Sequence, residues 1–227
     1  MAEHDRPPPA WLTALPDRVA ELDPEYFAMF APPPEVAKRS AVLILFGGAP
    51  GGGEDVLLTE RSYDLRSHAG QVSFPGGRID PEDDGPVAAA LRETWEEVGV
   101  EPSGVEVVGE LPGLFLQPSG NAVTPVLAWW RHPCTPDIAS HLEVARVVRA
   151  RVDELVDPAR RFTVIGPSGY RGPGFDVDGL FVWGFTAKLL EAVLDLAELS
   201  RPWDESLTRP LPQEMLTAAL RDRSRRQ

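Results

Sequence analysis

The chain has 227 residues, with 35 Asp and Glu against 22 Lys and Arg, so its formal net charge is −13. A hydrophobic content of 43% is ordinary for a folded protein, and the length is ample for a buried core. The acidic balance argues against stable binding of nucleic acid or of a membrane surface, because both require a basic face. It does not exclude small anionic substrates, since a bound divalent cation can reverse the local field.

The cysteine content and the first residues of the chain indicate in which cellular compartment the protein lies. The single cysteine, Cys134, excludes an internal disulfide and is typical of a reducing interior. The first residues, MAEHDRPPPAWL, have neither the basic region nor the apolar region of a signal peptide. The longest apolar runs, such as 41–46, are too short to span a bilayer. We therefore expect a cytoplasmic protein that does not bind membranes.

Proline placement predicts three parts of the chain. The first 34 residues contain eight prolines, which predict an extended arm over 1–36 with one short helix near 16–22. The main domain is expected at 37–200. A C-terminal extension at 201–227 ends in RDRSRRQ, which is typical of a solvated, frayed tail.

Within the main domain, short apolar runs rich in Val, Ile and Leu predict strands. They lie at 41–46, 55–60, 105–111 and 123–130, with a late β pair at 162–165 and 179–185 around a Gly/Pro-rich turn. Helices are predicted at 86–98 and 186–199, whereas the first half of 143–156 has both strand and helix features. The Gly-rich segment 47–55 lacks the Lys-Ser/Thr ending of a phosphate loop and is interpreted as a hairpin loop. Strands and helices mix without strict alternation, which predicts an α/β or α+β sandwich around a mixed sheet.

The helix at 86–98 has clear boundary signals. Asp83 and Asp84 precede it, Pro86 suits its first turn, and Gly99 suits its end. At about 100° per residue, one apolar stripe is expected to face the core. This stripe consists of Val87, Ala90, Leu91, Thr94 and Val98.

Three glutamates lie close together near the end of this helix. Glu93 and Glu97 are expected on the side away from the apolar stripe, one turn apart, where their like charges cost a few tenths of a kcal/mol. Arg92 and Glu96 form an attractive pair at the same spacing. Carboxylates so arranged are hard oxygen ligands suited to Mg²⁺ or Mn²⁺. A bare acidic helix face is usually only solvated, so the segment upstream decides between the two interpretations.

The upstream segment 57–77 is LLTERSYDLRSHAGQVSFPGG, and together with the helix it resembles the Nudix hydrolase family. The family pattern is Gly, five residues, Glu, seven residues, then Arg-Glu-aliphatic-x-Glu-Glu-x-Gly-aliphatic. Gly77 matches the leading glycine, and 92–100 match the end of the pattern. Three departures occur: Asp83 replaces Glu, eight residues separate it from Arg92, and Thr94 replaces an aliphatic residue.

These departures resemble one branch, the coenzyme A pyrophosphatase-like Nudix proteins. This branch tends to have one extra residue before Arg-Glu, and its signature LLTxRSxxLxxHxGQVxFPGG matches 57–77. The specific resemblance covers 57–100, and a looser likeness continues at 143–145 and 183–187.

The resemblance implies a Nudix-type α/β/α sandwich around a mixed sheet, with a site for Mg²⁺ or Mn²⁺. Glu93 and Glu97 are the implied principal metal ligands, Glu96 a third ligand or one acting through water, and the carbonyl of Gly77 a further one. Arg92 is expected to orient Glu96. Glu143 is a candidate general base from a later loop, with a polar strand-edge residue as the alternative.

Several cationic and aromatic residues are candidates for substrate contacts. Arg61, Arg66 and His68 are implied to meet the phosphates of the substrate, including a 3′-phosphate, although His68 is equally well interpreted as a hydrogen-bonded loop residue. For Trp129 and Trp130, packing is favoured over stacking on adenine, because adjacent strand residues point to opposite faces.

The implied activity is hydrolysis of the diphosphate of coenzyme A or a derivative, giving 3′,5′-ADP and 4′-phosphopantetheine or its acyl form. The alternatives are the same chemistry on ADP-ribose, a dinucleotide or capped RNA, and a non-catalytic Nudix module that binds a nucleotide. The expected partner is a small nucleotide substrate. The sequence leaves a homodimer open.

Overall fold

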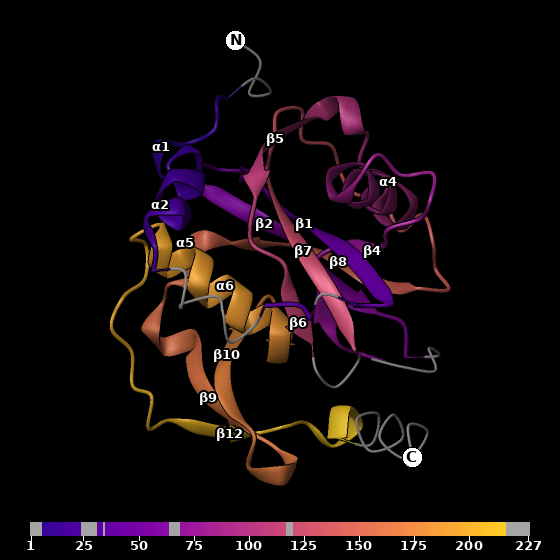
Figure 1. The fold of residues 1–227 in the computed structure, drawn as a ribbon. Helices are drawn as coiled ribbons and strands as arrows, with labels where there is room; N and C mark the ends of the chain where they lie inside the picture. The colour runs from indigo at the N-terminus through magenta and orange to yellow at the C-terminus, as the bar shows by residue number, and fades with distance from the viewer. Residues whose placement is uncertain (1–5, 24–30, 34, 64–68, 117–119, 217–227) are drawn as a thin grey trace. The chain divides into compact units, whose positions relative to one another are not determined.

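The structure is a computed structural model that describes residues 6–23, 31–33, 35–63, 69–116 and 120–216 (Figure 1). Its contacts divide the chain into a first unit, Met1–Gly48 with Phe74–Ala139, and a second unit, Ala49–Ser73 with Ser140–Gln227. We describe each unit by itself. Among the described residues, no helix has the length and apolar character needed to cross a membrane.

The first unit is built on a mixed sheet. Strand β1 (Lys38–Gly48) runs parallel to β7 (Asn121–Trp130), in register from Lys38 opposite Asn121 to Gly47 opposite Trp130. The remaining strands are antiparallel: β4 (Gly76–Arg78) pairs with β1, and β5 (Val105–Glu110) and β6 (Leu114–Leu116) pair with β7. The predicted strands at 41–46, 105–111 and 123–130 are therefore confirmed.

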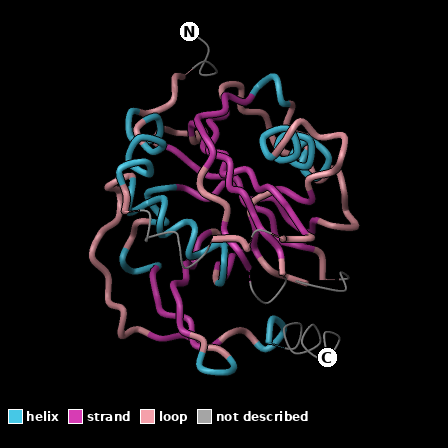
Figure 2. The backbone as a smooth tube through the Cα atoms, viewed as in Figure 1, coloured by secondary structure: helices cyan, strands magenta, loops and turns pink. Residues whose placement is uncertain are grey.

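Helix α4 (Pro86–Val98) lies against β1 and β4 and has the predicted boundaries (Figures 1 and 2). It follows Gly85, whose φ is 88°, and ends at Gly99, whose left-handed φ of 69° lets its N–H bond the carbonyl of Trp95. A short 3₁₀ helix, Pro102–Gly104, leads from α4 into β5. The element that carries the three glutamates is thus set on the sheet of the first unit.

Residues 6–23 of the proline-rich N-terminal segment are packed, so the prediction of an extended chain is wrong for this part, whereas α2 (Leu15–Glu21) confirms the short helix expected near 16–22. A second short helix, α1 (Ala10–Thr13), precedes it. Leu12 and Leu15 are buried, and the ring of Trp11 packs edge-on against Phe46 of β1 with centroids 5.0 Å apart. The apolar residues between the prolines drive this packing, because leaving them in water is unfavourable.

Both tryptophans at the end of β7 lie in the core. Trp129 and Trp130 are 0% and 2% exposed, which confirms the packing interpretation. The indole N–H of Trp129 donates to the carbonyl of Arg6 at 2.6 Å, so this buried polar group is satisfied by the N-terminal segment.

The second unit contains two groups of strands. In one, β2 (Glu54–Arg61) pairs antiparallel with β8 (Val144–Arg151) and with β3 (Val72–Ser73). The other is a sheet in the order β11 (Leu180–Val182), β10 (Arg171–Val177), β9 (Arg161–Ile165), β12 (Thr208–Pro210). The helical segments are α5 (Val152–Leu155), α6 (Gly184–Leu196) and two 3₁₀ helices, Pro158–Arg160 and Pro167–Gly169.

In this unit the structure answers one open question and differs from two expectations. The undecided first half of 143–156 is strand β8, and α5 follows it. The Gly/Pro-rich segment expected as a turn contains β10, which pairs with both β9 and β11, because Phe175 and Val177 alternate into the core. The late strand stops at Val182, since Gly184 already begins α6.

The Gly-rich segment at 47–55 and the C-terminal extension remain to be compared with their predictions. The Gly-rich segment forms a turn in which the N–H of Gly52 bonds the carbonyl of Ala49 at 3.0 Å, and strand β2 rather than a helix follows it. Part of the C-terminal extension is β12, which runs parallel to β9. The arginine-rich tail at 221–227 lies outside the described residues.

Candidate functional site

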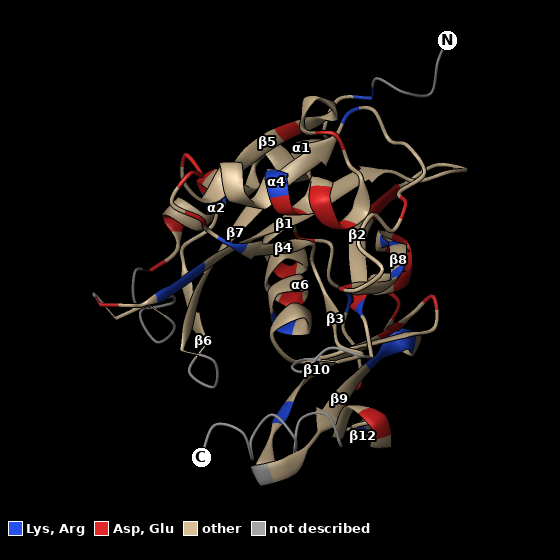
Figure 3. Cartoon of the chain, turned by 90° about the vertical axis from the view of Figure 1, so that its right-hand side faces the viewer, with Lys and Arg blue, Asp and Glu red and all other residues tan. Residues whose placement is uncertain are grey.

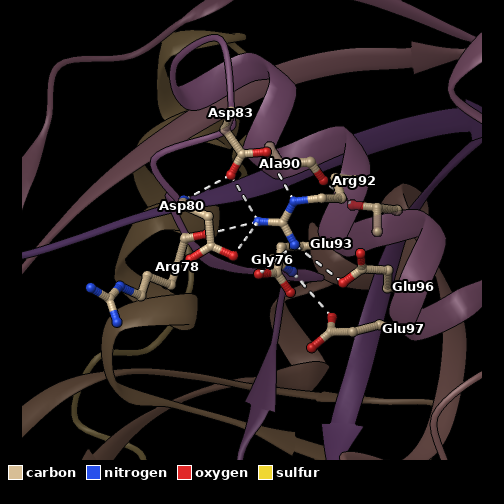
Figure 4. Close-up of polar contacts among 10 residues, drawn as sticks. Gly76, Arg78, Asp80, Asp83, Ala90, Arg92, Glu93, Glu96 and Glu97 are labelled. Carbon is tan, nitrogen blue, oxygen red and sulfur yellow. Dashed lines mark hydrogen bonds and ion pairs between the residues drawn. The ribbon is translucent and has the colours of Figure 1, made fainter.

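Two adjacent glycines on β4 create the surface of the candidate site (Figure 4). Gly76 has a φ of 148°, and a Cβ there would overlap the backbone of β1 at Ala41 and Val42. At Gly77 a Cβ would overlap the carboxylate of Glu93. Because neither position has a side chain, β4 lies close to β1 and the carboxylate of Glu93 lies directly on β4.

Glu97 is buried, with 4% of its surface exposed, and its Oε2 accepts a hydrogen bond from the N–H of Gly76 at 3.1 Å. The side chain of Glu93 is 16% exposed. The prediction that this pair faces away from the buried side of α4 is therefore wrong. Gly77 leaves room for the carboxylate of Glu93, so the buried side of the helix is rotated toward β4. Val87 and Leu91 are only half-buried.

Thr94 replaces the aliphatic residue of the family pattern and is buried as predicted. Its hydroxyl donates to the carbonyl of Ala90, one turn earlier, at 2.6 Å. This bond satisfies the only polar group of the side chain, so a threonine fits the apolar position at little cost.

Arg92 is at the centre of the polar contacts in the site (Figure 4). Its Nη1 donates to Glu93 Oε1 and to Glu96 Oε2, each at 3.1 Å. Its Nε and Nη2 donate to the two oxygens of Asp83 at 2.9 and 2.8 Å. Nη2 also donates to the carbonyl of Arg78 at 3.0 Å. One guanidinium therefore joins two glutamates of α4 to the loop before the helix and to the end of β4.

Asp83 is the carboxylate that holds the guanidinium of Arg92 in place. It sits one residue farther from Arg92 than the Glu of the family pattern, and it is one methylene shorter. Here it accepts both forked bonds from Arg92 and a third from the N–H of Asp80 at 2.8 Å. The bonds from Arg92, followed by the one from Asp80, lower the pKa of Asp83 to about 2. Reciprocally, these contacts raise the pKa of Arg92, so both groups are charged at neutral pH.

The three glutamates differ in their surroundings. Glu96 is 49% exposed and bonds Arg92, whereas Glu93 and Glu97 lie toward β4. Within the described ranges, no three His, Cys, Asp or Glu side chains converge on a point that would hold a metal ion. Mg²⁺ commonly binds proteins through only one or two carboxylates, with water and substrate phosphate oxygens as its other ligands. The hard oxygens of Glu93 and Glu97 fit an ion bound in that way.

The other candidate residues belong to the second unit. Arg61 ends β2, and its Nε is buried without a hydrogen-bond partner in the part of the chain that the structure describes. Glu143 is exposed, and its carbonyl accepts the N–H of Ser62 at 2.8 Å, so Arg61 and Glu143 are neighbours within this unit. Arg66 and His68 lie outside the described residues.

Comparison with known proteins adds independent findings. A family model described as NUDIX domain matches residues 37–161. The uncharacterized Nudix hydrolase NudL of Escherichia coli O7:K1 (strain IAI39 / ExPEC) is 40% identical over 158 residues, which is 67% of this chain and 79% of that protein.

Two solved structures are similar in fold. The Nudix hydrolase RenU from M. smegmatis aligns with a TM-score of 0.51 and 18% identity, over 73% of this chain and 89% of that one. A Nudix hydrolase from Alicyclobacillus acidocaldarius aligns with a TM-score of 0.50 and 17% identity, over 73% and 98% of the two chains. At these identities the likeness concerns the fold alone.

The forked contact between Asp83 and Arg92 predicts a pH-dependent contribution to stability. Because the pKa of Asp83 is lowered to about 2 in the folded protein, its contribution is fully present above the ordinary pKa of 3.8 and disappears as the pH falls toward 2. Asp83→Asn should therefore lower the urea midpoint at pH 7, and the difference from wild type should shrink between pH 4 and pH 2. A difference that is constant over this range would contradict the ionic role of Asp83.

Proposed function

The chain belongs to the Nudix domain family, and from this premise we propose that it hydrolyses the diphosphate bond of coenzyme A or a derivative. The products would be 3′,5′-ADP and 4′-phosphopantetheine, or its acyl form. The chain has a Nudix fold, with helices on a mixed sheet, and is a Nudix hydrolase for nucleoside diphosphate derivatives. Nudix hydrolases generally use divalent metal ions. The observation that carries the coenzyme A assignment is the signature at 57–77, and the carboxylate pair Glu93 and Glu97, held against β4, supports the hydrolase chemistry.

The donor chemistry supports Glu93 and Glu97 as the principal ligands of Mg²⁺ or Mn²⁺. Glu96 is held by Arg92 and more exposed, which suits contact through water, and the carbonyl of Gly77 is proposed as a further ligand. When bound, the ion would neutralise charge on the diphosphate and lower the pKa of a bound water.

The chain's own contribution is to hold these carboxylates in place. Arg92 fixes Glu93 and Glu96, and the N–H of Gly76 fixes Glu97. Asp83 fixes Arg92 in turn through two parallel bonds, which is the strongest geometry for this pair. Carboxylates held before the substrate binds need no rearrangement when charge develops on the phosphates, and this preorganisation is a large part of phosphoryl-transfer catalysis.

The remaining proposed residues come from the signature at 57–77 and from the segment before β8. Arg61, at the end of β2, is a proposed contact to a phosphate oxygen of the substrate, because a forked guanidinium matches the oxygens of a phosphate. Arg66 and His68 remain proposed phosphate contacts from the same signature. Glu143 is exposed, which suits a residue that removes a proton from water, and it remains the proposed general base.

Different features of the sequence distinguish the proposed function from its alternatives. ADP-ribose, a dinucleotide and capped RNA contain the same type of diphosphate, so only the signature at 57–77 favours coenzyme A over them. A non-catalytic module has no need for metal carboxylates. The presence of Glu93, Glu96 and Glu97 in a network with Arg92 therefore favours an enzyme.

A substrate panel tests the proposal. With Mg²⁺ or Mn²⁺, kcat/KM for coenzyme A or an acyl derivative should exceed that for ADP-ribose, a dinucleotide and capped RNA by about tenfold or more, a gap of about 1.4 kcal/mol in transition-state stabilisation. Removing the metal with EDTA should abolish turnover, and adding it back should restore the rate. Slow cleavage of coenzyme A together with fast cleavage of ADP-ribose would contradict the proposal and identify ADP-ribose as the substrate.

Conservative variants of the carboxylates test the site. Glu93→Gln and Glu97→Gln should each lower kcat by about 100-fold or more, because loss of a metal ligand costs at least as much as loss of a residue supporting one. Glu96→Gln should have a smaller effect, of about tenfold. The matched control is Glu101→Gln, which removes the same charge from an exposed position just after α4. Wild-type turnover in Glu97→Gln, with the fold retained by circular dichroism, would refute the metal assignment.

A further inference from the structure

Most arginines in the described part of the chain are paired with carboxylates. The paired residues are Arg92, Arg131, Arg146, Arg149, Arg151, Arg160, Arg161 and Arg209. In the first unit, Lys38, Arg39 and Arg78 are exposed and have no ion pair with any described residue. In an acidic chain, exposed cations gathered at one place without carboxylate partners are available to an external anion.

Two of these cations share one face of the sheet with two polar side chains. Arg78 on β4 lies opposite Ser40 on β1, so these side chains are on the same face. Lys38 precedes Ser40 by two residues and is also on that face. Asn121 on β7 lies opposite Lys38, and its amide donates to the hydroxyl of Ser40 at 3.0 Å. Lys38, Ser40, Arg78 and Asn121 therefore form one polar cluster, the β1–β4 cluster.

The two cations are close enough to act together. Diagonal neighbours on adjacent antiparallel strands are about 7–8 Å apart, within reach of long side chains. Lys38 and Arg78 are diagonal neighbours, because Arg78 pairs with Ser40, two residues after Lys38. Figure 3 shows blue segments at the adjoining ends of β1 and β4. Their ammonium and guanidinium groups can therefore meet on a single phosphate.

The β1–β4 cluster is distinct from the carboxylate site but is joined to it through the main chain. A Cβ at Gly77 points at Glu93, so the next residue, Arg78, projects to the opposite face, and Figure 4 shows its side chain directed away from the carboxylates. At the same time the carbonyl of Arg78 accepts a hydrogen bond from Arg92 at 3.0 Å. Among the described strands β4 pairs with β1 alone, and along its other edge the main chain bonds the side chains of Arg92 and Glu97.

We propose that Arg78 and Lys38 bind a phosphomonoester of the substrate while its diphosphate lies at Glu93 and Glu97. A phosphomonoester carries a charge of about −1.5 to −2 at pH 7 and has three acceptor oxygens, which matches two cations assisted by a hydroxyl and an amide. The inference rests on the proposed function, because coenzyme A has a 3′-phosphate in addition to its diphosphate. It assigns that 3′-phosphate to the β1–β4 cluster and leaves the diphosphate to the arginines and histidine of the signature at 57–77. Arg78 is then a residue that determines specificity for the phosphorylated substrate.

The test compares coenzyme A with 3′-dephospho-coenzyme A, which has the same diphosphate without the phosphomonoester. Arg78→Gln should lower the ratio of the two kcat/KM values roughly tenfold, as expected for loss of one charge-assisted contact, and the change should appear in KM. Lys38→Gln should lower the same ratio. The matched control is Arg39→Gln, which removes the same charge from the next residue of β1 but on the opposite face, and it should keep the wild-type ratio.

The outcomes separate this inference from the proposed function. If the wild-type protein cleaves neither compound, the proposed function is overturned and this subsite with it. If it cleaves both and Arg78→Gln keeps the wild-type ratio, the subsite alone is overturned. An equal fall of the ratio in Arg39→Gln would also overturn it, since the effect would then follow net charge rather than the β1–β4 cluster.

Discussion

The guanidinium of Arg92 is the group on which the geometry of the candidate site depends. It bonds Glu93 and Glu96 on its own helix, Asp83 in the loop before the helix, and the carbonyl of Arg78 at the end of β4. Without this cation, clustered carboxylates would repel one another and the loop would lose its attachment to α4. A single forked side chain thus converts an unfavourable concentration of negative charge into an ordered site.

The two glycines of β4 make the complementary contribution. Because Gly77 has no side chain, the carboxylate of Glu93 can lie against β4, and the N–H of Gly76 donates a hydrogen bond to Glu97. Part of the −13 charge is therefore gathered at this candidate site. The acidity argues against bulk nucleic-acid binding, yet it is compatible with a phosphate ester that meets divalent cations on one side of β4 and arginine on the other.

Local patterns in the sequence predicted the elements that form this site, and contacts between distant residues account for what they missed. β1 and α4 were predictable because a short Val/Leu/Ile run and helical periodicity between Pro86 and Gly99 are local signals. The buried side of α4 was predicted wrongly, because Glu97 bonds the N–H of Gly76, 21 residues earlier, and a contact between distant residues leaves no local pattern. α1 and β10 were missed for the same reason: prolines and glycines suggest extended chain or turn, whereas burial of Leu12 and Phe175 decides their structure.

The central claim is that this site cleaves the diphosphate of coenzyme A with water. Its most direct test is mass analysis of the products formed from coenzyme A in ¹⁸O water. The account predicts 3′,5′-ADP and 4′-phosphopantetheine, with one ¹⁸O atom in the phosphate of one product, which also identifies the phosphorus attacked. Intact coenzyme A, or products cut at any bond other than the diphosphate, would contradict it.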